Sequence, residues 1–107
     1  MKMLKRTEIA LAVLPKLIGA RTPVSAVHLA EQCQISYRRL ANVMVRLSNK
    51  GIVAGTRGGH GGYMLARPAA KIALVEVFEA MGDRLPADTR ILKRIMAGKG
   101  VLSELAA

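Results

Sequence analysis

One predicted helix carries a cluster of side chains that could bind a polyanion. They are Arg38, Arg39, Asn42 and Arg46, and they follow Ser36, a suitable N-cap residue whose helix N-terminus could also bind a phosphate. Arginine can make two hydrogen bonds to guanine and asparagine two to adenine, whereas Arg46, further along the helix, suits a phosphate. The pattern indicates contacts with nucleic acid, although a solvated basic helix face has the same composition.

A second group of candidate residues lies near residue 60. Two strand-like runs, 52–57 and 63–66, flank the segment Gly58-Gly59-His60-Gly61-Gly62, which is the pattern of a β-hairpin with a glycine-rich tip. Arg57 suits the narrow, negative minor groove of DNA, and His60 could contact a phosphate. The glycines could also serve only to supply the positive φ angles of a turn. A phosphate-binding P-loop is excluded because the sequence Gly-x-x-x-x-Gly-Lys-Ser/Thr is absent.

Charge is distributed unevenly along the chain. The 107 residues include 17 Lys and Arg against 7 Asp and Glu, a formal charge of +10. The whole excess falls on residues 1–71, and no acidic residue occurs between Glu31 and Glu76. Solubility alone does not require such a window, so the first two-thirds of the chain are predicted to bind a polyanion. With only two Tyr and one Phe, binding of single strands by base stacking is not expected.

Residues for other chemistry are few. Cys33, His28 and His60 lack the spacing of metal ligands, so no metal site and no cofactor are predicted. A single cysteine excludes a disulfide framework and fits the reducing cytoplasm. Because no Ser–His–acid or paired-carboxylate arrangement stands out, we do not expect an enzyme. No uncharged apolar run approaches the length of a membrane-spanning helix.

The elements that would position these residues follow from apolar periodicity and end signals. Helices are predicted over about 7–18 with Thr7 as N-cap and a kink at Pro15, over a short segment after Ser25, from Ser36 to Asn49, and through Val75 to Glu79. Two short helices joined by a tight turn and followed by a hairpin are typical of a winged helix-turn-helix. The fold class is therefore mainly α with a small β-hairpin, and residues 1–82 form the DNA-binding domain.

The remaining segment, residues 83–107, is predicted to form a dimerisation helix that begins near Asp88. Its apolar positions alternate at spacings of four and three, which is a heptad pattern. The predicted interface residues are Ile91, Ile95, Leu102 and Leu105. Glycines at 98 and 100 each cost about 1 kcal/mol inside a helix, so a break in this helix is the alternative.

The sequence resembles the IscR/NsrR-type winged-helix transcription regulators over about residues 5–82. The resemblance is strongest in the hairpin, and a weaker match occurs at 101–105. The matching segments are Pro23–Ser25, Leu29–Glu31, Ile35–Ser36, Leu40, Leu47, Lys50–Val53, Arg57–Gly58 and Gly61–Pro68.

The resemblance implies a homodimer on a pseudo-palindromic DNA site, with Arg57 in the minor groove. It also implies major-groove contacts by Ser36, Tyr37, Arg38 and Asn42. Many members hold an iron–sulfur cluster on three cysteines, but no cysteine follows Cys33, so no cluster is expected here. Ala41 stands where members often have a glutamate, so a different DNA sequence is expected.

The predicted function is that of a homodimeric DNA-binding regulator of transcription, most simply a repressor, with an effector that the sequence does not identify. One alternative is an architectural protein that binds double-stranded DNA without sequence preference. Another is a protein-interaction adaptor, which would not require an acid-free window.

Overall fold

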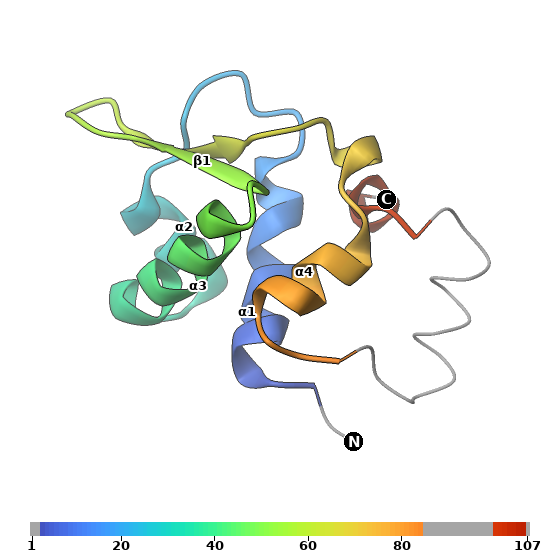
Figure 1. The fold of residues 1–107 in the computed structure, drawn as a ribbon. Helices are drawn as coiled ribbons and strands as arrows, with labels where there is room; N and C mark the ends of the chain where they lie inside the picture. The colour runs from blue at the N-terminus through green and yellow to red at the C-terminus, as the bar shows by residue number, and fades with distance from the viewer. Residues whose placement is uncertain (1–2, 85–99, 107) are drawn as a thin grey trace.

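The computed structural model describes residues 3–84 and 100–106. Its elements are α1 (Lys5–Val13), the 3-10 helix η1 (Leu14–Leu17), α2 (Ala26–Cys33), α3 (Tyr37–Asn49), β1 (Val53–Thr56), β2 (Gly62–Leu65), the 3-10 helix η2 (Ala69–Lys71), α4 (Leu74–Ala80) and the 3-10 helix η3 (Leu102–Ala106). The predicted fold class, mainly α with a small β-hairpin, is confirmed. α1 runs through the middle, with α2, α3 and the hairpin on one side and α4 and the C-terminal segment on the other (Figure 1). Among the described residues, every helix is too short or too polar to span a bilayer.

The helix-turn-helix pair begins where the sequence predicted it. The Ser25 hydroxyl accepts a hydrogen bond from the backbone N–H of His28 at 3.1 Å, and the Ser36 hydroxyl accepts one from that of Arg39 at 3.2 Å. Each bond satisfies one of the free N–H groups at a helix start. Between the helices, Gln34 adopts a left-handed conformation with φ of 55°. The left-handed Gln34 and the Ser36 cap therefore produce the tight turn.

The start of α1 differs from the prediction. Thr7 is not the N-cap: the helix begins at Lys5, and Thr7 is buried inside its first turns. The cap comes instead from Asp83, whose Oδ2 accepts hydrogen bonds from the Thr7 hydroxyl at 2.7 Å and the Leu4 N–H at 2.9 Å. These bonds, that from Thr7 above all, hold the pKa of Asp83 below its ordinary value of 3.8. Near Pro15, where a kink was predicted, the α-helix ends at Val13 and the chain passes into the 3-10 helix η1.

The hairpin is attached directly to the helix-turn-helix. β1 and β2 are antiparallel, with a register that runs from Val53↔Leu65 to Thr56↔Gly62. Tyr63 also exchanges two backbone hydrogen bonds with Val24, the residue before the α2 N-cap: its N–H donates at 2.9 Å and its carbonyl oxygen accepts at 3.0 Å. This pairing sets the orientation of the hairpin relative to α2 and α3.

Gly62 is required by that close approach, and its replacement provides a test. A Cβ atom at Gly62, where φ is +155°, would collide with the carbonyl group of Val24. We expect Gly62→Ala to lower the free energy of unfolding by about 1–3 kcal/mol, measured by urea denaturation. Gly59→Ala is the matched control, because a Cβ there meets nothing within 4 Å. Equal stability of the two variants would contradict the proposed attachment of the hairpin.

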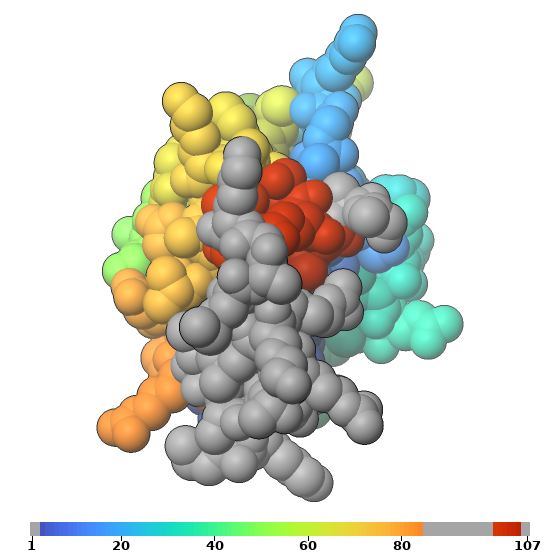
Figure 2. All heavy atoms as spheres, turned by 90° about the vertical axis from the view of Figure 1, so that its right-hand side faces the viewer, coloured from blue at the N-terminus to red at the C-terminus, as the bar shows by residue number. Residues whose placement is uncertain are grey.

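The C-terminal segment completes the hydrophobic core. Leu102 is fully buried in the same cluster as Leu14, Leu17 and Ile72. Its N–H donates to the Ile72 carbonyl at 2.8 Å, and the Leu74 N–H donates to the Gly100 carbonyl at 2.8 Å. In Figure 2 this segment, in red, lies against the part of the chain drawn in yellow and orange, which includes η2 and α4. One chain thus folds its own C-terminal end into its core.

This arrangement corrects one predicted dimer contact. Leu102 is enclosed within its own chain and has no surface left for a partner, and Leu105 is partly buried against the same core. Gly100 has φ of +65°, so a single helix does not continue through it, in agreement with the alternative of a break. Ile91 and Ile95 lie outside the described residues. The boundary at residue 82 stays a prediction, although residues beyond it contribute to the core of the first part.

Arg67 and Glu76 join the end of the hairpin to the start of α4. The Arg67 guanidinium donates two hydrogen bonds of 3.0 Å to the Glu76 carboxylate and one of 2.9 Å to the Lys71 carbonyl. The same carboxylate accepts the Ala73 N–H at 2.9 Å and so caps α4. A planar guanidinium paired with both carboxylate oxygens is a strong and directional contact. These bonds, led by those from Arg67, lower the pKa of Glu76 below its ordinary value of 4.5.

Stability is expected to depend on pH through this contact. Because the pKa of Glu76 is lower in the folded chain than in the unfolded one, the stabilisation is present above the ordinary value. It is lost as the pH falls through 4.5 toward the folded value. We expect Glu76→Gln to lower the free energy of unfolding by about 1–3 kcal/mol at pH 7 and by clearly less at pH 3. Urea denaturation at both pH values measures this, and Glu79→Gln, which removes an exposed partner of Lys50, is the control. An equal loss at both pH values would rule out the contact as its source.

Candidate nucleic-acid interface

Helix α3 has one buried and one exposed face, as its sequence predicted. Its buried residues are Leu40, Val43, Met44 and Leu47, at the spacing of one helix face. The predicted DNA-binding residues on α3 and at its start are all exposed: Ser36, Tyr37, Arg38, Arg39, Asn42 and Arg46. The structure therefore leaves all six residues accessible to a partner, and their role in binding stays a prediction.

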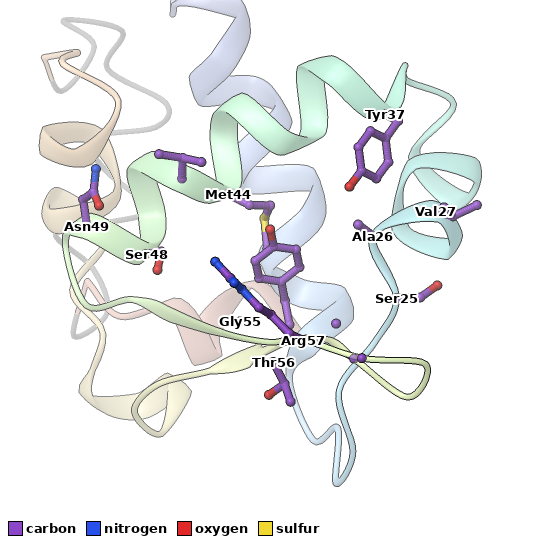
Figure 3. A pocket seen from close by; sticks show the side chains of 15 residues that line it. Ser25, Ala26, Val27, Tyr37, Met44, Ser48, Asn49, Gly55, Thr56 and Arg57 are labelled. Atoms are coloured by element: carbon purple, nitrogen blue, oxygen red, sulfur yellow. The ribbon is translucent and has the colours of Figure 1, made fainter.

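A groove separates α3 from the hairpin, which we call the wing (residues 53–65). This wing groove has a volume of about 540 Å³ and opens toward the N-terminus of α2 (Figure 3). Its walls include Tyr37, Val45 and Ser48 from α3, and Thr56 and Arg57 from the wing. The groove is therefore formed by both elements that the sequence predicted to contact DNA.

The two predicted wing residues differ in their positions. Arg57 is exposed, and its side chain extends into the wing groove toward α3 (Figure 3). His60 is exposed at the hairpin tip and is not part of the groove wall. At the tip, Gly58 has φ of +110°, and a Cβ at Gly61 would collide with backbone carbonyls. The backbone conformation therefore requires glycine at these two positions. A Cβ on Gly59 would meet open space.

A second groove, of about 930 Å³, lies on the opposite flank of α3 and is bordered by α1. Arg39, Asn42 and Arg46 line it from α3, and Lys5 and Arg6 line it from α1. The predicted α3 residues are thus divided between two flanks, with Tyr37 beside the wing and the three polar residues beside α1. Sequence reasoning did not associate Lys5 and Arg6 with this surface, because only the packing of α1 on α3 brings them there.

The arginines of α3 and the wing have no carboxylate partner among residues 3–84 and 100–106. Salt bridges in this part of the chain join Lys5 to Glu8, Lys50 to Glu79 and Arg67 to Glu76. None involves Arg38, Arg39, Arg46 or Arg57. Since ion pairing inside the described chain does not neutralise them, these arginines are available to an anionic partner.

Residues 3–97 match the model of the Rrf2 family, described as iron-dependent transcriptional regulators. The chain belongs to the Rrf2 family. The resemblance to IscR-type regulators seen in the sequence is confirmed, because the transcriptional regulator IscR of Cereibacter sphaeroides is 38% identical over 64 residues. That match covers 60% of this chain and 41% of the relative.

Solved structures similar to this Rrf2-family chain share its fold. IscR of T. potens is 26% identical with a TM-score of 0.66, covering 91% of this chain and 72% of the other. CymR, the global cysteine regulator of B. subtilis, is 21% identical with a TM-score of 0.74, and the match covers 99% of this chain and 96% of CymR. This chain spans about half the length of the curated relatives that it matches.

The family description raises the question whether this chain could hold iron. The sequence has one cysteine, Cys33, which is half-buried at the end of α2 and packs against the core. Within the described residues, no three His, Cys, Asp or Glu side chains are grouped as metal ligands. Cysteine thiolates are the usual ligands of iron–sulfur clusters. A cluster on three cysteines therefore does not fit the residues of this sequence.

Proposed function

We propose that this Rrf2-family chain is a sequence-specific, DNA-binding transcriptional repressor that acts as a homodimer on a pseudo-palindromic site. The observation that carries the proposal is the exposed face of α3 beside the wing. Arg38 and Arg57 have no carboxylate partner there among the described residues, and Asn42 is exposed on the same helix. The major groove of DNA is wide enough to admit an α-helix such as α3, and a wing can reach the adjacent minor groove.

The surface supplies two kinds of contact. Arg39 and Arg46, together with Lys5 and Arg6 across the α1 groove, suit phosphates, and such contacts give affinity that falls steeply with salt. Arg38 and Asn42, near the middle of the exposed face, suit base edges and give sequence preference. The combination favours a protein that selects a site rather than one that only coats DNA.

Site selection from random duplex DNA is the direct test. The selected duplex and a scrambled one are then titrated at several salt concentrations. A palindromic site bound at least about 10³-fold more tightly than the scramble would support the proposal. Equal binding with a steep salt dependence would indicate an architectural protein, and no binding at low salt would overturn DNA binding altogether.

The homodimer is proposed from the apolar spacing of Ile91 and Ile95. Two recognition helices about 34 Å apart would then fit successive major grooves. We expect Ile95→Asp to sediment as a monomer, because a carboxylate cannot remain charged in an apolar interface without a partner. A variant that remains dimeric at the same concentration would place the interface elsewhere.

We also propose that this chain works without an iron–sulfur cluster. Its single cysteine supports this, since a free half-buried thiol commonly serves as a small apolar residue. Anaerobic incubation with iron and sulfide should leave both the visible absorption spectrum and the affinity for the selected duplex unchanged. A cluster spectrum that persists after gel filtration would contradict this part of the proposal.

A further inference from the structure

The exposed face of α3 carries two parallel rows of side chains, each at spacing i, i+4, i+8. One row is polar and consists of Arg38, Asn42 and Arg46. The other, which we call the apolar row, consists of Tyr37, Ala41 and Val45. Residues four apart lie above one another on a helix, so each row is continuous along the face that is proposed to enter the major groove.

The apolar row is not part of the core. Tyr37 is 58% exposed and Val45 is 57% exposed, while Ala41 is partly exposed. Val27, at the start of α2, is 57% exposed and lines the same wing groove as Tyr37 and Val45. Among the described residues, five large apolar side chains are exposed. Three of them, Val27, Tyr37 and Val45, line the wing groove. Single exposed apolar residues are ordinary on protein surfaces, but such a cluster marks a binding surface.

The charge near the row indicates what covers it. Arg57 lines the wing groove, and Arg38 and Arg46 belong to the neighbouring polar row of α3. None of the three has a carboxylate partner in the described part of the chain, so the partner is anionic as well as locally apolar. Duplex DNA meets both conditions. In the major groove each base pair shows hydrogen-bonding groups, and thymine alone adds an apolar group, its 5-methyl. Alanine and larger apolar side chains are suitable contacts for that methyl.

We propose that the apolar row of α3 contacts thymine 5-methyl groups and so selects A·T pairs next to the positions contacted by Arg38 and Asn42. This inference rests on the proposed function. It assigns sequence selection to Val45 and Ala41, which have no hydrogen-bonding side-chain groups. It also gives a positive role to Ala41, which cannot accept a hydrogen bond from cytosine.

Deoxyuridine provides the test, because it differs from thymidine only in the missing methyl. In the selected duplex, each thymine of one half-site is replaced in turn by deoxyuridine, and the affinity is measured by fluorescence anisotropy. We expect a loss of about fourfold at one or two thymines, since one buried methyl is removed there. At the other thymines the affinity should not change.

The variant Val45→Ala connects that loss to the row. It should bind the thymine duplex about as weakly as the unchanged chain binds the deoxyuridine duplex, and it should no longer distinguish the two duplexes. Val75→Ala is the control, because Val75 is 41% exposed on α4, away from the wing groove. This control should retain the full difference between thymine and deoxyuridine.

Each other outcome is decisive. Tight, selective binding with equal affinity for thymine and deoxyuridine at every position would overturn the inference and leave the proposed function standing. If Val45→Ala then also lowers self-association in sedimentation, the row is a contact between copies of the chain. Failure to bind any duplex at low salt would overturn both proposals.

Discussion

Replacement of Arg57 by alanine is expected to weaken binding to the selected duplex by about 5- to 150-fold while the chain remains folded. Arg57 is exposed and extends from the wing into the groove beside α3, so its removal leaves no cavity. A guanidinium in a narrow minor groove gains from the enhanced negative potential there, and no neighbouring side chain of the glycine-rich tip can replace it. Fluorescence anisotropy at fixed salt measures the loss.

Two control variants test whether the effect depends on the position and shape of the Arg57 side chain or only on the net charge of the protein. Lys71→Ala removes one positive charge from η2, away from α3 and the wing, and should change the affinity little (Figure 1). Arg57→Lys keeps the charge but not the planar fork, so an intermediate affinity is expected. Unchanged affinity of Arg57→Ala, with normal stability, would remove the wing from the DNA-binding surface.

Replacement of Leu102 by alanine is expected to lower the free energy of unfolding by about 2–5 kcal/mol. Leu102 is fully buried, and its backbone N–H bonds to the Ile72 carbonyl, so the rest of the segment cannot easily collapse into the space that a smaller side chain leaves. Urea denaturation followed by circular dichroism measures the change. The affinity of the folded fraction for DNA should not change, because this segment lies on the side away from the wing.

Leu105→Ala is the matched control for this prediction. It removes the same atoms from the same C-terminal segment, but Leu105 is only partly buried, so the loss should be clearly smaller. A loss of less than about 0.5 kcal/mol for Leu102→Ala would mean that this side chain does not fill the core.

The helix-turn-helix and the wing could be predicted from the sequence because the signals that define them are local. Ser25 and Ser36 cap helices that begin at the next residue, and the buried face of α3 follows from a spacing of three and four. The glycine-rich tip separates two short strands that pair with each other. Bonds between residues close in the chain require little closure entropy, so local sequence determines such elements.

The surface composition of α3 was only partly predictable. The spacing predicts an exposed position for Arg38, Arg39, Asn42 and Arg46, because they fall between the buried positions. The basic and polar pattern does not point to Val45, although Val45 lies off the buried spacing of Leu40, Val43, Met44 and Leu47. That departure from periodicity was the available signal for an exposed apolar residue.

The sequence by itself determined the helix-turn-helix, the hairpin and the concentration of positive charge on the first two-thirds of the chain. Only the tertiary structure decided three further features: the Asp83 cap of α1, the contact of Gly62 with Val24, and the burial of Leu102 in place of a dimer contact. In each of them, the partners are many residues apart. An apolar residue such as Leu102 can be buried against its own chain or against a second copy, and the spacing of apolar residues along the sequence is the same in both cases. The choice depends on which apolar surface the folded core leaves uncovered, and that surface exists only once the chain has folded.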